Sequence, residues 1–329
     1  MRNACCGIQI TRLVSEFPHI LIKRTRPWIF RVLKLIKTLD LPSHPSGGFD
    51  HGDVVEASGL SFVAHTGNGT VEVYNGRKGV HIKTITGVPG ASGVVCGQAE
   101  KRVIAASRGT GKILVLDGET GETVREVQVG SKPNGLAWDS RRHRFLVADV
   151  GDNHLRIVDP ADGSLVGEIP LQGRPRWGKY SSTLDRYVVN VHDPDQLAII
   201  DPETSSVEVT IPIPVVGPHG VDIDEETGIA YIACDGGALV MVDIEKRRVL
   251  ARVEIHPNPD VAWLNVKRGV LYVASSKPGS VQVVDIKEMR VIEEVITEEG
   301  CHTVSFDQEA QTLHAYLRKS CGVAFYKEC

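Results

Sequence analysis

Short apolar segments separated by turns rich in Gly, Asp and Pro fill most of the chain, and one of their patterns recurs. The pattern is apolar-x-apolar-apolar-Asp, and its last position returns every 42 residues without a slip. The seven copies end at Asn75, Asp117, Asp159, Asp201, Asp243, Asp285 and, in degenerate form, Lys327. A fixed period of about 40–45 residues built from short strands is typical of β-propeller blades.

Each repeat contains four segments with the composition of strands. In the fifth copy they are HGVDID, IAYIACD, ALVMVD and RVLARVEI, joined by the turns EETG, GG and IEKR. Val, Ile and Tyr favour strands, whereas Gly, Asp and Pro favour turns. The sequence therefore predicts an all-β fold, a seven-bladed β-propeller with four-stranded blades of about 42 residues. We expect the blades to start near residues 50, 91, 133, 176, 218, 259 and 301.

The last repeat supplies only three of its four strands before the sequence stops at Cys329. The missing pattern appears before the first blade, as FRVLKLIKTLDLP. An open ring would leave strand edges unpaired, which invites aggregation. We therefore predict that residues 29–41 form a closing strand that completes the last blade, inside a propeller domain spanning residues 29–329.

Residues 1–28 differ from the rest because they are basic and carry no repeat. We expect a disordered or loosely docked extension. Arg12 and Glu16 interrupt the apolar stretch that a secretory signal needs, so a cytoplasmic location is the default expectation. No apolar run reaches the ~18 residues of a membrane span.

Charge and cysteine content narrow the partners. The formal net charge is -4, which argues against nucleic acid as a partner because such binding relies on a basic surface. The seven cysteines include no CxxC pair and are predicted to be free thiols. A disulfide from Cys301 to Cys321 or Cys329 is compatible with the sequence but not indicated by it.

The second strand of the repeat carries a family resemblance. The segments SFVAH, VIAAS, FLVAD, YVVNV, YIACD and LYVAS, followed by third strands of the VxVxD type, resemble the YVTN family of β-propeller repeats over residues 30–329. The Tyr-Val-Thr-Asn signature itself is replaced by YIAC and YVAS. The resemblance implies the fold and, because related propellers are often exported, an alternative location. It leaves function open, since such propellers include binding proteins, lactonases and lyases.

Candidate site residues come from the start of each innermost strand. The segments FDHG, GASG, KPNG, PRWG, GPHG, NPDV and GCHT align one variable position per blade, just before a position that is usually Gly. Equivalent positions in a closed ring face a common axis, so we expect them at one mouth of the central channel. They are His51, Ser92, Asn134, Trp177, His219, Asp260 and His302, with Arg176 beside Trp177.

These residue types suit ligand binding. His51, His219 and His302 are candidate metal ligands, because neutral imidazole binds Zn, Cu, Fe or Ni. The same histidines could instead cap backbone carbonyls. Trp177 suits stacking on a flat ligand. No cofactor is identified by the sequence, and a divalent metal ion is the candidate.

Three functions are compatible with this pattern. The first is a binding propeller whose His-rich channel mouth holds a small molecule or a protein. The second is a lactonase-like, metal-assisted hydrolase or lyase, in which an ion polarises a carbonyl and a histidine moves a proton. The third is a nucleic-acid-binding propeller, supported only by the basic extension.

Overall fold

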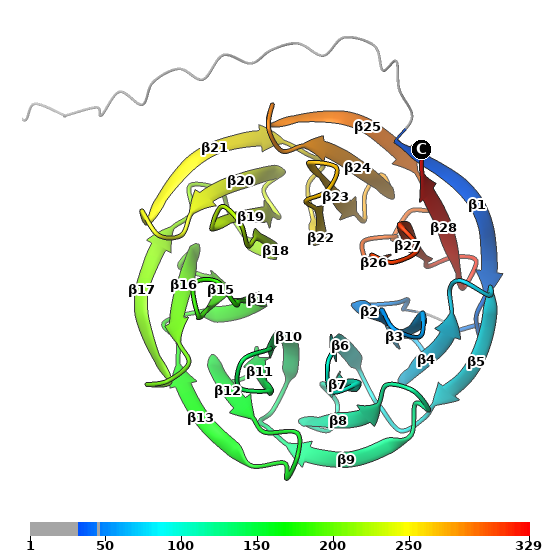
Figure 1. The fold of residues 1–329 in the computed structure, drawn as a ribbon, viewed down its shortest axis with the longest axis horizontal. Coiled ribbons are helices and arrows are strands. Elements are labelled where there is room, and N and C mark those ends of the chain that lie inside the picture. Colours follow the sequence, from blue (N-terminus) through cyan, green and yellow to red (C-terminus); the bar gives the residue numbers. More distant parts are fainter. Residues whose placement is uncertain (1–31, 45–46) are drawn as a thin grey trace, which may run out of the picture.

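The structure is a computed structural model that describes residues 32–44 and 47–329. Within these residues the regular elements are strands, arranged as seven four-stranded sheets around a ring (Figure 1). The predicted seven-bladed β-propeller is therefore confirmed. Residues 1–28, predicted to form an extension, lie outside the described residues. The described part of the chain has no helix that could cross a bilayer.

Each blade runs outward from the central channel, with its first strand innermost (Figure 1). The first strands are β2 (Gly52–Val55), β6 (Ala91–Gly97), β10 (Pro133–Asp139), β14 (Arg174–Ser181), β18 (Pro218–Asp224), β22 (Pro259–Asn265) and β26 (Val304–Asp307). The second strands are β3 (Leu60–His65), β7 (Arg102–Ser107), β11 (Arg144–Asp149), β15 (Arg186–His192), β19 (Ile229–Cys234), β23 (Val270–Ser275) and β27 (Thr312–Leu317).

The third and fourth strands complete the blades. The third strands are β4 (Thr70–Asn75), β8 (Lys112–Asp117), β12 (His154–Val158), β16 (Gln196–Asp201), β20 (Ala238–Asp243), β24 (Ser280–Asp285) and β28 (Gly322–Glu328). The fourth strands are β5 (Val80–Ile85), β9 (Thr123–Gln128), β13 (Leu165–Pro170), β17 (Ser206–Pro212), β21 (Arg248–Glu254), β25 (Arg290–Ile296) and, in the last blade, β1 (Leu33–Asp40).

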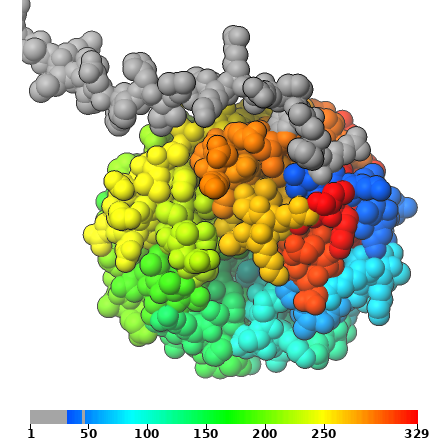
Figure 2. Space-filling model, turned by 45° about the horizontal axis from the view of Figure 1, so that its top comes forward, coloured from blue at the N-terminus to red at the C-terminus, as the bar shows by residue number. Residues whose placement is uncertain are grey.

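The burial of each strand follows from its place in the blade. Blades pack face to face around the ring, so a middle strand such as β19 is buried along its whole length. The outermost strand β21 alternates exposed and half-buried residues, because one face of a strand meets the neighbouring blade and the other meets solvent. Apolar side chains of adjacent blades meet between the sheets, as Ile199 and Ile232 do. Figure 2 shows the blades following one another in sequence order.

The ring closes as predicted, with β1 antiparallel to β28 from Leu33 opposite Glu328 to Asp40 opposite Gly322. The start of this strand is also fixed to the sixth blade. The carboxylate of Glu293 in β25 accepts the amide of Leu33 at 3.0 Å. Leu33 is buried among residues of the sixth and seventh blades. The closing strand therefore joins two blades.

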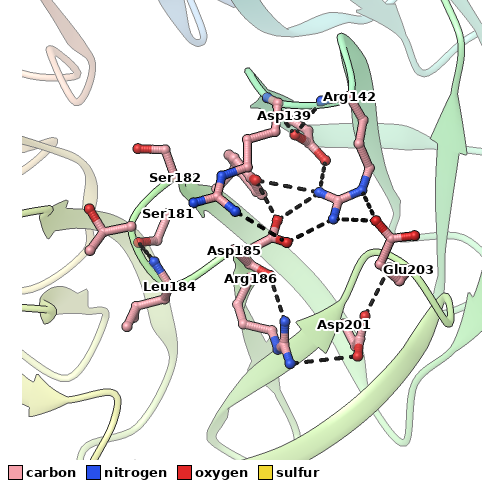
Figure 3. A network of polar contacts seen from close by, with 12 residues as sticks. Asp139, Arg142, Ser181, Ser182, Leu184, Asp185, Arg186, Asp201 and Glu203 are labelled. Carbon is pink, nitrogen blue, oxygen red and sulfur yellow. Dashed lines mark hydrogen bonds and ion pairs between the residues drawn. The ribbon is translucent and has the colours of Figure 1, made fainter.

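An ionic cluster, the Arg142 cluster, joins the third and fourth blades on the face where the first strands end (Figure 3). The Arg142 guanidinium donates to Asp139, Asp185 and Glu203 at 2.6–3.0 Å. Tyr180 donates to Asp185 at 2.6 Å. These partners raise the pKa of Arg142, and its hydrogen bonds lower that of Asp185.

The cysteines agree with the prediction of free thiols as far as they are described. Among residues 32–44 and 47–329 the cysteines are all unpaired, including Cys301, Cys321 and Cys329. Cys301 is buried, and burial raises its thiol pKa to about 11.

Candidate functional site

Strand pairing defines a polar ring at the end of the channel where the first strands begin. We align the seven first strands by the residue that pairs with the fourth residue of the neighbouring second strand. In the first blade Gly52 pairs with Val63, and in the fifth blade Val221 pairs with Ile232. The residue two positions before this aligned residue is, in each blade, a member of the polar ring, which we call the mouth ring. Its members are Asp50, Ser92, Asn134, Arg176, His219, Asp260 and His302.

This alignment corrects the sequence alignment by one residue in two blades. His51 and Trp177 precede Gly52 and Gly178, which occupy the position of Val221 and not that of Gly220. Both side chains still reach the mouth. His51 from the first blade stacks on Trp177 from the fourth, with ring centroids 3.9 Å apart and planes 13° apart. Since these blades lie across the ring from each other (Figure 1), the pair bridges the channel.

Asp260 is the centre of the mouth, and the three predicted histidines surround its carboxylate. Nε2 of His219 lies 2.8 Å from Oδ1, and Nδ1 of His302 lies 2.8 Å from Oδ2. Nε2 of His51 is 3.6 Å from Oδ1. Burial opposes the charge of Asp260, but the histidines outweigh burial and hold its pKa well below the ordinary value.

The three imidazoles differ in charge. Burial lowers the pKa of His51 more than Asp260 and Asp50 raise it, so this ring is neutral near pH 7. Burial also disfavours the charged form of His219 and His302, yet their carboxylate partners prevail and raise both pKa values. His219 is held from two sides, because Asp235 lies 3.0 Å from its Nδ1. His302 is the most exposed of the three side chains, at 27%.

Arginines from two blades reach the same mouth. Arg176 lies 2.7 Å from Nδ1 of His219 and 3.2 Å from Asp235. Arg108, in the loop after β7, pairs with Asp50. Arg174 is exposed and pairs with no acid among the described residues, and burial together with Arg176 and Arg108 lowers its pKa.

Several buried polar atoms at the mouth have no partner within the part of the chain that the structure describes. They are Nε of Arg108, Nε of Arg176 and Oδ1 of Asn134. Asn134 and Ser92 belong to the mouth ring, but their side chains form no hydrogen bond with the imidazoles. The Ser92 hydroxyl donates to the carbonyl of Pro133, and the Ser92 carbonyl accepts the amide of His51 at 3.1 Å. The mouth thus presents donors and an acceptor that the protein itself does not satisfy.

One group of residues has the spacing of a metal site. Asp50, His51 and Asp260 are buried and offer ligand atoms within 4.8 Å of one another, and they form the one such group among the described residues. Nε2 of His51 is 3.3 Å from Oδ1 of Asp50 and 3.6 Å from Oδ1 of Asp260. Bonds of ~2.0–2.1 Å around a tetrahedral ion place its ligands about 3.3 Å apart, so both distances from His51 are compatible with a shared ion. His219 and His302, predicted as ligands, contact Asp260 rather than joining this group.

A second polar ring lies deeper in the channel and was not predicted. Pairing places Asp53, Lys179, Asp222 and Trp263 at equivalent positions. Nζ of Lys179 is 3.3 Å from Oδ1 of Asp222 and 4.7 Å above the Trp263 ring. Burial lowers the pKa of Lys179, but Asp222 and Asp53 reverse that effect, so the lysine is charged and its charge is compensated.

Sequence reasoning missed Asp50, Arg108 and Arg174 as members of the mouth. Asp50 stands beside His51 in the aligned segment FDHG, and a strand-register argument would have chosen it. Arg108 lies in the loop between second and third strands, which the topology places at this face.

No protein-family model matches this chain, and no curated protein matches it. The YVTN assignment therefore stays a prediction.

Proposed function

We propose that this propeller binds a small anionic ligand, carrying a carboxylate or a similar oxyanion, at the channel mouth. The observation that carries this proposal is the group of three guanidinium groups, two of which keep a buried Nε without a partner. An oxyanion accepts hydrogen bonds from guanidinium N–H groups in the geometry that arginine favours. A rigid ring of blades suits a binding scaffold in general.

The charge balance of the mouth supports an anion. Arg108, Arg174 and Arg176 are matched in number by Asp50, Asp235 and Asp260. The raised pKa values of His219 and His302 favour their charged forms, which shifts this balance toward positive charge. A buried charge without compensation is costly, so an incoming anion is favoured over a neutral ligand.

Tryptophan fluorescence provides the test, because Trp177 stacks on His51 beside the ring. Succinate and citrate are titrated into the protein at constant ionic strength. We expect a saturable change that Trp177→Phe removes and Arg174→Gln weakens at least tenfold. Arg141→Gln, which removes an exposed arginine from the Arg142 cluster, is the matched control and should bind normally. Equal binding by Arg174→Gln and Arg141→Gln would refute the proposal.

The spacing of Asp50, His51 and Asp260 favours a second candidate, a divalent metal site. A neutral His51 is a suitable ligand, and Arg108 would orient Asp50 from outside. When bound, such an ion would polarise a substrate carbonyl. His302, the most exposed histidine, would then hold or donate the proton. This arrangement corresponds to the hydrolase or lyase alternative.

Metal analysis separates the two candidates. Protein purified without chelator is measured by mass spectrometry for Zn, Mn, Fe, Co, Ni, Cu and Mg, and it is then titrated with Zn²⁺. A metal site predicts about one ion per chain and its loss in Asp50→Asn. Absence of stoichiometric metal, together with citrate binding, would leave only the anion proposal.

A further inference from the structure

A cavity of about 510 Å³ lies between the last and first blades, on the face opposite the channel mouth. Its walls come from the closing strand β1, the turn after β4 and the last blade. The lining residues that matter below are Lys37, Gly76, Arg77, Asp307, His314 and Lys327. Its size lies within the range of small-molecule sites, ~300–1,000 Å³.

His314 in β27 lies against this cavity and is fully buried. Its Nδ1 lies 2.9 Å from the Tyr74 hydroxyl, which is 3.0 Å from the Tyr316 hydroxyl. Its Nε2 has no hydrogen-bond partner in the described chain. Burial lowers the pKa of His314 to about 3, so the ring is neutral. If Tyr74 donates to Nδ1, the proton resides on Nε2, which is then an unused donor.

The repeat shows that this histidine is not required by the fold. His314 is the third residue of its second strand. The equivalent residues of the other blades are Phe62, Ile104, Leu146, Val188, Tyr231 and Tyr272. The last blade therefore places an imidazole where apolar or aromatic packing suffices elsewhere.

Gly76 forms the part of the cavity wall next to this imidazole. A Cβ atom at this position would lie 2.6 Å from Cε1 and 2.9 Å from Nε2 of His314. Any side chain would therefore collide with the ring. The absence of a side chain at Gly76 therefore lets the backbone of this turn pack directly against the ring.

The cavity is lined by more positive than negative charge. Arg77 forms a two-point ion pair with Asp307 at 2.8 and 2.9 Å, and Glu56 lies 3.7 Å from the same guanidinium. Within the described residues, Lys37 and Lys327 pair with no carboxylate. Nζ of Lys37 donates to the Arg77 carbonyl at 3.2 Å, and Nζ of Lys327 donates to the Ala310 carbonyl.

We infer that this cavity is a second ligand site, specific for a small molecule bearing an oxyanion, either phosphate or carboxylate. The two lysines supply the uncompensated charge, and the unpartnered imidazole nitrogen supplies a directional donor. The site is independent of the channel mouth. A ligand held there would contact β1, β28 and the turn of the first blade together, and it would therefore stabilise the closed ring.

Thermal unfolding tests this inference in the full chain. Inorganic phosphate and citrate are the probes, with chloride at matched ionic strength as the reference. At a probe concentration about tenfold above Kd, the melting temperature should rise by about 3 °C. A larger rise with phosphate identifies a phosphate-bearing ligand, and a larger rise with citrate identifies a carboxylate.

Variants locate the effect. In the Arg174→Gln background, where citrate binds the mouth weakly, Lys37→Gln combined with Lys327→Gln should abolish the rise. Lys34→Gln combined with Lys287→Gln removes the same charge elsewhere and should preserve it. His314→Leu restores the apolar residue of the repeat and should fold while the rise falls by at least half. Arg174→Gln alone should lose only the part of the citrate rise that binding at the mouth contributes. The inference is overturned if neither probe acts up to ~50 mM, or if the Lys37/Lys327 variant responds like the Lys34/Lys287 variant.

Discussion

The channel mouth and the Arg142 cluster are both ionic clusters, but they distribute their charges in opposite ways. At the mouth, one carboxylate, Asp260, contacts three imidazoles at the starts of inner strands, and nearby arginines keep unpartnered nitrogen atoms. In the Arg142 cluster, one guanidinium makes five hydrogen bonds to three carboxylates, one of which, Glu203, is largely exposed.

Under the proposed function, this difference separates charges that stabilise the fold from charges that bind a ligand. The Arg142 cluster satisfies its own donors and holds two blades together at their turns. The mouth leaves donors unused after neutralising its acids, which is the condition for binding something else. Both regions contain polar residues, so their presence alone does not distinguish the regions. The number of buried polar atoms without a hydrogen-bond partner does.

Removing the central carboxylate should have the largest effect. Asp260→Asn takes from His51, His219 and His302 the charge that they share. Breaking a buried ion pair by deleting one partner costs about 3–5 kcal/mol. Denaturant unfolding at pH 6 measures the loss. A loss below about 1 kcal/mol would mean that the mouth behaves like a surface cluster.

Arg142→Met keeps much of the aliphatic stem and should cost less, about 2 kcal/mol, mainly because buried Asp139 loses a partner. Exposed partners such as Glu203 contribute little. The same unfolding experiment measures this variant, and succinate binding at the mouth should be unchanged. Impaired binding would show that the two faces are coupled.

The free energy of unfolding should depend on pH through the mouth but not through the Arg142 cluster. This difference is smaller, on the order of 1 kcal/mol. His219 and His302 have raised pKa values, so their stabilisation is complete below about pH 6.5 and is lost as pH rises through the folded values. Asp260 has a lowered pKa, so its stabilisation is present above about pH 4 and is lost as pH falls through the folded value.

The free-energy difference between wild type and Asp260→Asn should therefore be largest between about pH 4 and 6.5 and should shrink above pH 7. The difference between wild type and Arg142→Met should stay constant from about pH 5 to 9, since the pKa of Arg142 is raised and that of Asp185 is lowered out of this range. Denaturant unfolding across this range measures both. If the two free-energy differences changed with pH in the same way, the distinction between the mouth and the Arg142 cluster would be wrong.

The smallest effect on stability is expected at the residue most important for recognition. Arg174→Gln should change the unfolding free energy by less than about 0.5 kcal/mol, because this arginine is exposed and forms no ion pair in the described chain. Its effect should appear in citrate affinity instead. A large loss of stability would assign Arg174 to the fold rather than to the site.

The sequence was sufficient for the fold because a strict 42-residue period repeats the same four strands. The closing strand followed from the incomplete last repeat. The aligned strand entries also included His219, Asp260 and His302, and the structure places both histidines in contact with Asp260. Whether these residues bind a ligand stays a prediction.

The rest depended on features that a linear alignment does not contain. The glycines Gly52 and Gly178 occupy the position of Val221 and not that of Gly220, so alignment on glycines chose His51 and Trp177, one residue beyond the mouth-ring members Asp50 and Arg176. Arg108 reaches the mouth through a long side chain, whose direction no pattern specifies. The cavity beside His314 arises between the two blades that are most distant in sequence.

The closing strand has a further consequence. The amide of Cys329 donates to the carbonyl of Val32 at 3.0 Å, so the two ends of the propeller are already neighbours. A short linker between them, with the chain reopened in the loop at residues 214–217, would give a circular permutant that retains every strand but builds each blade from contiguous sequence. The junction of the last and first blades would then be covalent, and the ring would close between the fourth and fifth blades by packing alone. Comparing unfolding rates of the two connectivities would measure how far detachment of β1 controls the lifetime of the native ring.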